Sequence, residues 1–250
     1  MSVSIGPYAI APIGLGLMSL TWRGSSTFPP DEQAFEVIKS AIEHSTSDGA
    51  NASGTRLLLN AGAFYGPQDN AYANLKLIRR FFTKYPAYKD RVVLNVKGGA
   101  VMKEYAAKGM AGLRFSAAVD DLRADLTEIR KQLGSDEGGI DVHVFEQARR
   151  DLETSVEDAV KNLLTIQKEG LFQHLALSEV GADSIATAVS TARELGSDIV
   201  SVEVEYSPFL TEIEGNGVRD TCRRLGVPIL AYSPRELLAS SLFRFSSLLT

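Results

Sequence analysis

The chain has 250 residues, of which 44% are hydrophobic and 23% are charged, and its formal net charge is −5. This length fits one α/β barrel or two smaller domains. The slightly negative net charge gives no indication of a basic surface that would bind nucleic acid or an anionic membrane. No run of about 18 apolar residues occurs, so we expect no membrane span. A single cysteine, Cys222, excludes an intrachain disulfide and a cysteine-based metal cluster. Residues 1–12 lack the features of a signal peptide, and we expect a cytoplasmic protein.

Short apolar runs alternate along the chain with longer segments of helical periodicity. The opening segment Val3–Pro12 is expected to form a small hairpin at the bottom of the fold, because Gly6-Pro7 favours a turn. Seven later runs are almost continuously apolar, which is typical of parallel strands covered on both faces. They are Ile13–Leu17, Arg56–Asn60, Val92–Lys97, Ile140–Gln147, His174–Ser178, Ile199–Glu205 and Pro228–Tyr232.

Helices are predicted between these strands from apolar residues that recur with helical spacing. The predicted helices are Asp31–His44, Asn70–Lys84, Phe115–Leu133, Ser155–Glu169, Ala182–Leu195 and Gly217–Leu225. A capping box of Thr154 and Glu157 is expected to begin the fourth of them. The polar, glycine-bearing segment Ser45–Gly54 is typical of a flexible surface loop. Leu237–Leu249 has a helix-like pattern.

Regular alternation of strands and helices with short connections predicts βαβ units and a parallel sheet. Seven units without a break favour a closed barrel formed by one domain, residues 1–250. An open dinucleotide-binding sheet would need a glycine-rich fingerprint, and Gly14 and Gly16 lack the third glycine. A (β/α)8 barrel needs eight strands. We therefore predict a TIM-type barrel that lacks the last βα unit, with a gap or a distortion between the seventh strand and the first.

Polar residues recur where the predicted strands end, which is where barrel enzymes place their active sites. An ammonium group close to a phenol favours the phenolate and lowers the tyrosine pKa. Such a tyrosine can protonate a developing alkoxide, while a nicotinamide cofactor would supply hydride. The candidates for this chemistry are Asn60, Tyr65, Lys97, Ser178, Glu203 and Tyr206.

Each candidate also has a purely structural interpretation. Taken alone, Lys97 could be a solvated strand end, and Tyr65 could be a packed aromatic residue in a turn. Glu203 lies within an apolar run, where a carboxylate is costly unless it is paired. It is therefore either functional or part of an internal ion pair. The three histidines show no metal-ligand spacing, so they are assigned structural or surface roles and no metal is predicted.

The same positions carry a resemblance to aldo-keto reductases. Ile13–Trp22 resembles the first barrel strand of this family, in the form used by its fungal pyridoxal reductase branch. Leu59–Gly66 and Val96–Gly99 resemble the blocks that hold the catalytic tyrosine and lysine. Phe145–Asp151 resembles the block of the catalytic histidine. Further matching blocks, in the same order as in the family, are Leu177–Val180, Val202–Ser207 and Gly226–Pro234.

The resemblance implies a role for each matching residue. Tyr65 would be the proton donor and Lys97 its pKa-lowering partner. Asn60 stands where most of the family has aspartate, and Ala148 stands where most have histidine; the pyridoxal reductase branch shares both changes. Ser178 and Glu203 would hold the nicotinamide carboxamide, and Tyr206 would stack on its ring. Met18 and Ser233 would also bind the cofactor, whereas Trp22 and Ala148 would line the substrate pocket.

The implied activity is NADP-dependent reduction of a pyridoxal-like aldehyde to the alcohol. A small aldehyde would be the partner of a monomer or weak oligomer that binds neither nucleic acid nor membrane. After Pro234 the sequence departs from the family pattern, so a basic site for the NADP 2′-phosphate is expected to be missing, with Arg235 and Arg244 as the remaining cations. The alternative is a catalytically inactive, truncated barrel that acts as an interaction protein. A barrel lyase or isomerase would need a glycine-rich phosphate loop after the seventh strand, which is absent from the sequence.

Overall fold

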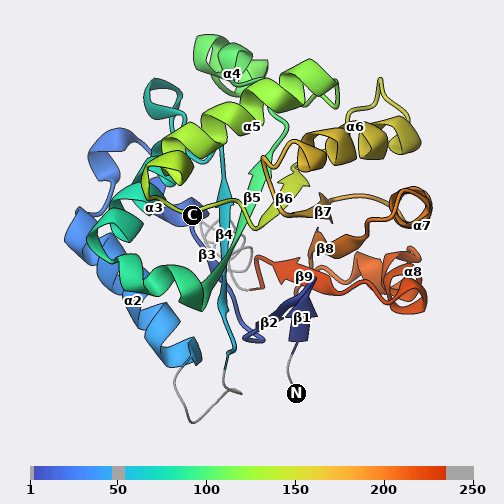
Figure 1. Cartoon of the computed structure of the whole chain (residues 1–250), viewed down its shortest axis with the longest axis horizontal. Coiled ribbons are helices and arrows are strands. Elements are labelled where there is room, and N and C mark those ends of the chain that lie inside the picture. The colour runs from blue at the N-terminus through green and yellow to red at the C-terminus, as the bar shows by residue number, and fades with distance from the viewer. Residues whose placement is uncertain (1–2, 47–53, 235–250) are drawn as a thin grey trace, which may run out of the picture.

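The main sheet has seven parallel strands whose order in space follows their order in the chain. The structure, a computed structural model, describes residues 3–46 and 54–234. Helices surround the sheet on its outer side (Figure 1). The strands are β3 (Leu15–Gly16), β4 (Leu57–Gly62), β5 (Val92–Gly98), β6 (Val144–Gln147), β7 (His174–Ser178), β8 (Ile199–Glu205) and β9 (Ile229–Tyr232). This is the topology of a (β/α)8 barrel. Within the described residues β9 does not pair with β3, so the predicted fold and its gap are confirmed.

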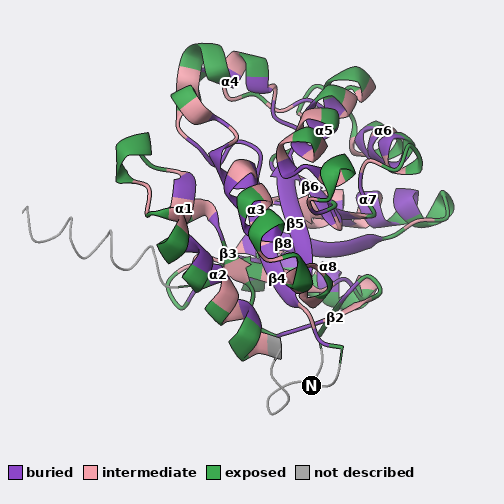
Figure 2. Cartoon of the chain, turned by 60° about the vertical axis from the view of Figure 1, so that its left-hand side comes forward, coloured by how far each residue is buried: buried purple, intermediate pink, exposed green. Residues whose placement is uncertain are grey.

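The helices turn buried faces toward the sheet and exposed faces toward solvent (Figure 2). They are α1 (Met18–Thr21), α2 (Asp31–Thr46), α3 (Ala73–Lys84), α4 (Met102–Lys108), α5 (Val119–Leu133), α6 (Val156–Lys168), α7 (Ala182–Glu194) and α8 (Val218–Leu225). All six predicted helices are present. The prediction missed α1 and α4, because such short helices span too few turns to show an apolar periodicity. Among the described residues no helix is both long and apolar enough to cross a membrane.

The start of α6 differs from the prediction by one residue. Ser155, not Thr154, is the N-cap, and its hydroxyl accepts a hydrogen bond from the Asp158 backbone N–H at 3.1 Å. Thr154 instead donates to the Asp151 carboxylate at 2.9 Å. Ser155 has an extended backbone (φ −61°, ψ 155°), which is the conformation that an N-cap requires.

Several predictions fall on residues that the structure does not describe. They concern most of the loop Ser45–Gly54, the helix-like run Leu237–Leu249, and the cations Arg235 and Arg244.

A small hairpin closes one end of the barrel, as predicted. Strands β1 (Val3–Ile5) and β2 (Tyr8–Ile10) pair antiparallel around Gly6, which has a φ of +54°. A side chain at Gly6 would also crowd Val200, because its Cβ would lie 3.1 Å away. The hairpin packs on residues of the barrel strands that point into the barrel. Hairpin and strand residues together form one apolar layer: Ile5, Ile10, Leu58, Val93, Val144, Ala176 and Val200.

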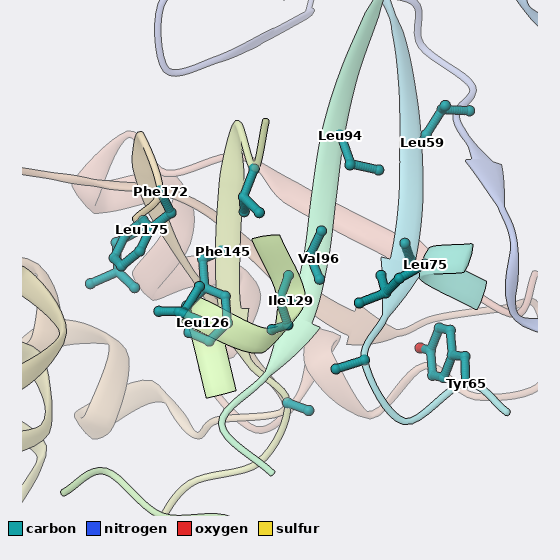
Figure 3. Close-up of a cluster of buried hydrophobic side chains, with 14 of the residues drawn as sticks. Leu59, Tyr65, Leu75, Leu94, Val96, Leu126, Ile129, Phe145, Phe172 and Leu175 are labelled. Atoms are coloured by element: carbon teal, nitrogen blue, oxygen red, sulfur yellow. The ribbon is translucent and has the colours of Figure 1, made fainter. Parts of the chain in front are cut away.

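A second, larger core fills the space between the sheet and the helices. Leu94 and Val96 of β5 belong to this cluster together with Leu126 and Ile129 of α5 (Figure 3). Tyr65 lies at its edge, beyond the end of β4 toward which the parallel strands point (Figure 3). The outer core thus fixes the sheet, and the turn that follows β4 carries Tyr65.

Candidate active site

Alternation along the strands places polar side chains directly above the apolar layer inside the barrel. Successive inward positions lie two residues apart, so Asn60 follows Leu58, and Glu146 follows Val144. In the pairing of β5 with β6, Lys97 is the register partner of Glu146. Charged residues are rarely buried unless they are paired, yet the exposed fractions of Lys97, Glu146 and Glu203 are 5%, 0% and 2%.

Lys97 is the centre of a buried network that joins four strands. Its ammonium lies 2.9 Å from a carboxylate oxygen of Glu146 and also contacts the carboxylate of Glu203. The ammonium also donates a hydrogen bond to Asn60 Oδ1 at 3.1 Å. The Asn60 amide in turn donates to the second oxygen of Glu203. The ammonium therefore donates hydrogen bonds to Asn60 and Glu203 and forms an ion pair with Glu146, which together hold Lys97 in one position.

The charges in this network shift the pKa values of its members. Burial alone would lower the pKa of Lys97, but the negative charges of Glu146 and Glu203 raise it well above its usual range. Lys97 is therefore positively charged at neutral pH. Burial and the neighbouring Glu203 raise the pKa of Glu146, whereas Lys97 opposes the shift.

Tyr65 is held beside this network by a tight turn after β4. A Cβ on Gly62 would lie 2.9 Å from the Tyr65 ring, so the residue at position 62 must be glycine for the ring to lie there. Thr21 donates to the Tyr65 carbonyl at 2.7 Å, and the Trp22 ring stacks on Tyr65 with ring centres 5.3 Å apart. Asn74 of α3 donates to Thr21 at 2.9 Å, which joins α1 to α3 beneath the turn.

The pKa of Tyr65 differs from the expectation in its net direction. Burial raises it, and although the positive charge of Lys97 lowers it as expected, the net shift is upward. The sequence could not show how deeply the ring is buried. The phenol is therefore protonated at neutral pH, which is the state that a proton donor needs.

A cavity of about 740 Å³ opens onto Tyr65 and Lys97. Its polar lining includes Asn60, Glu203 and Ser233, and its apolar lining includes Met18 and Trp22. The structure therefore brings seven of the ten predicted site residues together around one cavity: Met18, Trp22, Asn60, Tyr65, Lys97, Glu203 and Ser233. A cavity of this size can hold a small organic ligand.

Three predicted site residues do not line this cavity. Ala148 is fully buried, and its backbone N–H donates to the Gly98 carbonyl at 3.0 Å. Ser178 is 1% exposed, and its hydroxyl has no hydrogen-bond partner among the described residues. The Tyr206 hydroxyl donates to Glu214 at 2.6 Å, and Tyr206 does not line the cavity.

Two residues of the site were missed from the sequence. Glu146 is a charged residue within the apolar run Ile140–Gln147, which is the signal that singled out Glu203 and could have found it as well. Arg149 lines the cavity and is exposed. No local pattern distinguishes Arg149 from the neighbouring Arg150, so only the structure could identify it.

The fold agrees with the comparison with known proteins. The profile of the Aldo/keto reductase family matches residues 12–244. The chain belongs to the aldo/keto reductase family.

Similar fungal proteins cover most of the chain. A Schizosaccharomyces pombe protein named "Probable pyridoxal reductase 2" is 36% identical over 230 residues, which is 92% of this chain and 60% of that protein. A Saccharomyces cerevisiae protein named "Putative pyridoxal reductase" is 33% identical, and the match covers 92% of this chain and 61% of that protein. The chain thus spans about 60% of the length of these curated relatives.

A solved structure supports the fold. The crystal structure of the thermostable aldo-keto reductase Tm1743, in complex with the inhibitor epalrestat, superposes with a TM-score of 0.66. It is 20% identical in sequence, and the superposition covers 93% of this chain and 72% of that one. At this identity the likeness concerns the barrel alone.

Proposed function

We propose that the chain is an NADP-dependent oxidoreductase that reduces an aldehyde to the corresponding alcohol, with Tyr65 as proton donor. The observation that carries this proposal is the Tyr65 phenol beside the Lys97 ammonium, at the wall of a cavity of about 740 Å³. Membership of the aldo/keto reductase family supports the reaction class. The names of the fungal relatives support a pyridoxal-like aldehyde as substrate.

The residues around the cavity fit a nicotinamide group next to a small aldehyde. The cavity extends from Ile5 and Ile10 of the hairpin to Tyr65 and Lys97, so part of its volume adjoins the reactive residues. Its lining combines apolar walls with a few polar groups, as in small-molecule sites. Met18 and Ser233 would contact the cofactor on one side. The cofactor, when bound, supplies hydride to the carbonyl carbon.

The protein's own contribution is proton transfer and charge stabilisation. Tyr65 donates its phenolic proton to the carbonyl oxygen as negative charge develops there. The resulting phenolate is stabilised by the Lys97 ammonium, which Glu146, Glu203 and Asn60 hold in place. Trp22, stacked on Tyr65, keeps water from this side of the phenol.

The cavity also favours an aromatic aldehyde that carries an acidic group. Trp22 and Phe64 offer ring faces and edges to a planar substrate. Arg149 at the same cavity can pair with a phenolate. We further propose that residues 1–250 act as one domain, as a cytoplasmic monomer or weak oligomer.

The proposal is tested by following NADPH oxidation at rising concentrations of pyridoxal and of simple aromatic aldehydes. Turnover that is lost in Tyr65→Phe and retained in Tyr206→Phe would support it, because Tyr206 does not line the cavity. If the chain binds no NADPH and turns over no aldehyde, the proposal fails and the inactive barrel becomes the better description.

A further inference from the structure

The buried network around Lys97 contains one more negative group than positive groups. The carboxyl groups of Glu146 and Glu203 both contact the same ammonium, and all three side chains are at least 94% buried. An uncompensated charge is expensive in such surroundings. Neutralising one carboxyl group with a proton removes this excess.

The geometry at Glu146 indicates where that proton resides. Neither carboxyl oxygen of Glu146 has an aligned hydrogen bond among the described residues, although Lys97 lies 2.9 Å away. A carboxylate without aligned donors lacks the stabilisation that hydrogen bonds give to the ionised form, so for Glu146 the charge of Lys97 is left to oppose protonation. A protonated carboxyl group can instead donate to the neighbouring carboxylate, as in other buried pairs of acids that share one proton.

We propose that Glu146 and Glu203 share a single proton beside Lys97, and that this proton recharges Tyr65 after each reduction. The shared proton follows from the charges and contacts alone, whereas its use by Tyr65 rests on the proposed reductase function. The upward shift of the Glu146 pKa, caused by burial and by Glu203, agrees with a neutral carboxyl group at this position.

The proton balance of the proposed relay can be written in three steps. Tyr65 gives its proton to the alkoxide oxygen of the product and becomes a phenolate. Lys97 then gives one of its protons to the phenolate, which restores the phenol and leaves a neutral amine. The carboxyl group that holds the shared proton protonates this amine and becomes a carboxylate. Solvent later returns one proton to the pair, so that the aldehyde has gained one hydride and one proton overall.

Few other titratable groups face this pair. Tyr65 approaches Lys97 from the turn after β4, and the Tyr232 ring of β9 lies 5.8 Å from the Lys97 ammonium. Neither is a cation that could balance the second carboxylate. The cation that acts on Glu146 is Lys97 itself.

Infrared spectroscopy of the chain without substrate tests the shared proton directly. A protonated carboxylic acid has a carbonyl stretch that ionised carboxylates lack, and the band shifts in D2O. Asp125, another buried acid with a raised pKa, would give a similar band. All samples therefore carry Asp125→Asn, which preserves an acceptor for the Gly99 N–H.

We expect one buried acid band at neutral pH in the Asp125→Asn protein. Glu146→Gln and Glu203→Gln should each abolish it, because either variant leaves one carboxylate for one ammonium. Glu205→Gln, on the same strand as Glu203, should retain it. Absence of the band in the Asp125→Asn protein, or its survival in either single variant, would overturn the shared proton. The first criterion needs no substitution in the network and so holds even if a glutamine variant does not fold.

Rapid kinetics tests the use of the proton. In Glu146→Gln the first turnover uses the proton already on Tyr65, so the ratio of the first-turnover rate to the steady-state rate should be larger than in the parent protein. Later turnovers should be slower, giving a burst of one alcohol per chain that grows more distinct at alkaline pH. Equal slowing of the first and later turnovers would show a positioning role only and refute the relay. Infrared results remain interpretable if no aldehyde is reduced, so failure of the reductase proposal is distinguishable from failure of this one.

Discussion

Lys97 and Glu146 are register partners on adjacent parallel strands, and their charged groups lie 2.9 Å apart inside the barrel. The position on β4 that faces the same ammonium is occupied by Asn60, which accepts a hydrogen bond but carries no charge. The negative charge that holds Lys97 therefore comes from β6 and β8.

Replacing Tyr65 with phenylalanine removes the phenol and leaves the ring. We expect turnover in aldehyde reduction to fall at least about 100-fold, which is the usual effect of losing a positioned general acid. The Trp22 stacking contact persists in this variant, so the fold should be retained. Steady-state kinetics with NADPH measures the effect, and unchanged turnover would show that another group donates the proton.

Lys97→Met should lower turnover by a similar factor and also change the pH profile. The Lys97 charge opposes the effect of burial on the Tyr65 pKa. Without that charge the phenol pKa rises further, and the alkaline limb of the profile should move to higher pH. Lys161→Met, at an exposed ion pair on α6, is the matched control. An alkaline limb that stays in place would contradict the proposed coupling.

Ala148→His is expected to reduce stability without simply improving catalysis. Ala148 is fully buried and does not line the cavity, so an imidazole has no prepared space. Inserting a larger side chain into a packed core typically costs about 1–3 kcal/mol. Denaturant unfolding measures this loss, and a panel of aldehydes shows whether substrate preference changes. Faster turnover of every aldehyde with unchanged stability would disprove the expectation.

The strand pattern alone predicted most of the barrel. Continuous apolar runs identify parallel strands because helices cover one face of each strand and the barrel interior lies on the other. The sequence also placed Tyr65, Lys97 and Asn60 at strand ends that the structure brings together. The sequence could not show that the Tyr206 hydroxyl donates a hydrogen bond to Glu214, because this contact depends on the path of the loop between the two residues.

The acid–base network was only partly visible in the sequence. Glu203 was recognised as a carboxylate in an apolar run, with a role left open between function and an internal ion pair. The structure shows the ion pair with Lys97. The partnership with Glu146 depends on strand register and barrel curvature, which local patterns do not determine.

Asp125 gives the protein a stability that depends on pH. It lies on α5, with one carboxyl oxygen accepting the Gly99 N–H at 2.7 Å and the other without a hydrogen-bond partner among the described residues. Burial raises its pKa from 3.8 to about 7, although the Gly99 hydrogen bond opposes the shift. The native state therefore keeps its proton at a pH where the unfolded chain has already lost it.

The sign of the effect follows from this difference in bound protons. Between about pH 4 and pH 7 the native state binds one more proton at Asp125 than the unfolded state, so the free energy of unfolding falls as pH rises. The total loss is about 4 kcal/mol across this window, at 1.36 kcal/mol per pH unit. His143 works in the opposite direction, because burial lowers its pKa from 6.5 to about 4. The contribution of His143 to the free energy of unfolding therefore increases as pH rises through this range, and it partly cancels the decrease caused by Asp125.

Comparison with Asp125→Asn separates the two contributions. Asparagine can accept the Gly99 N–H and does not titrate, so the variant should lose the contribution of Asp125 and keep those of the other groups, including His143. The difference in unfolding free energy between the two proteins should therefore favour the variant increasingly from about pH 4 and become constant above about pH 7. Denaturant melts at a series of pH values measure it. A difference that does not change with pH would show that Asp125 titrates normally in the folded chain.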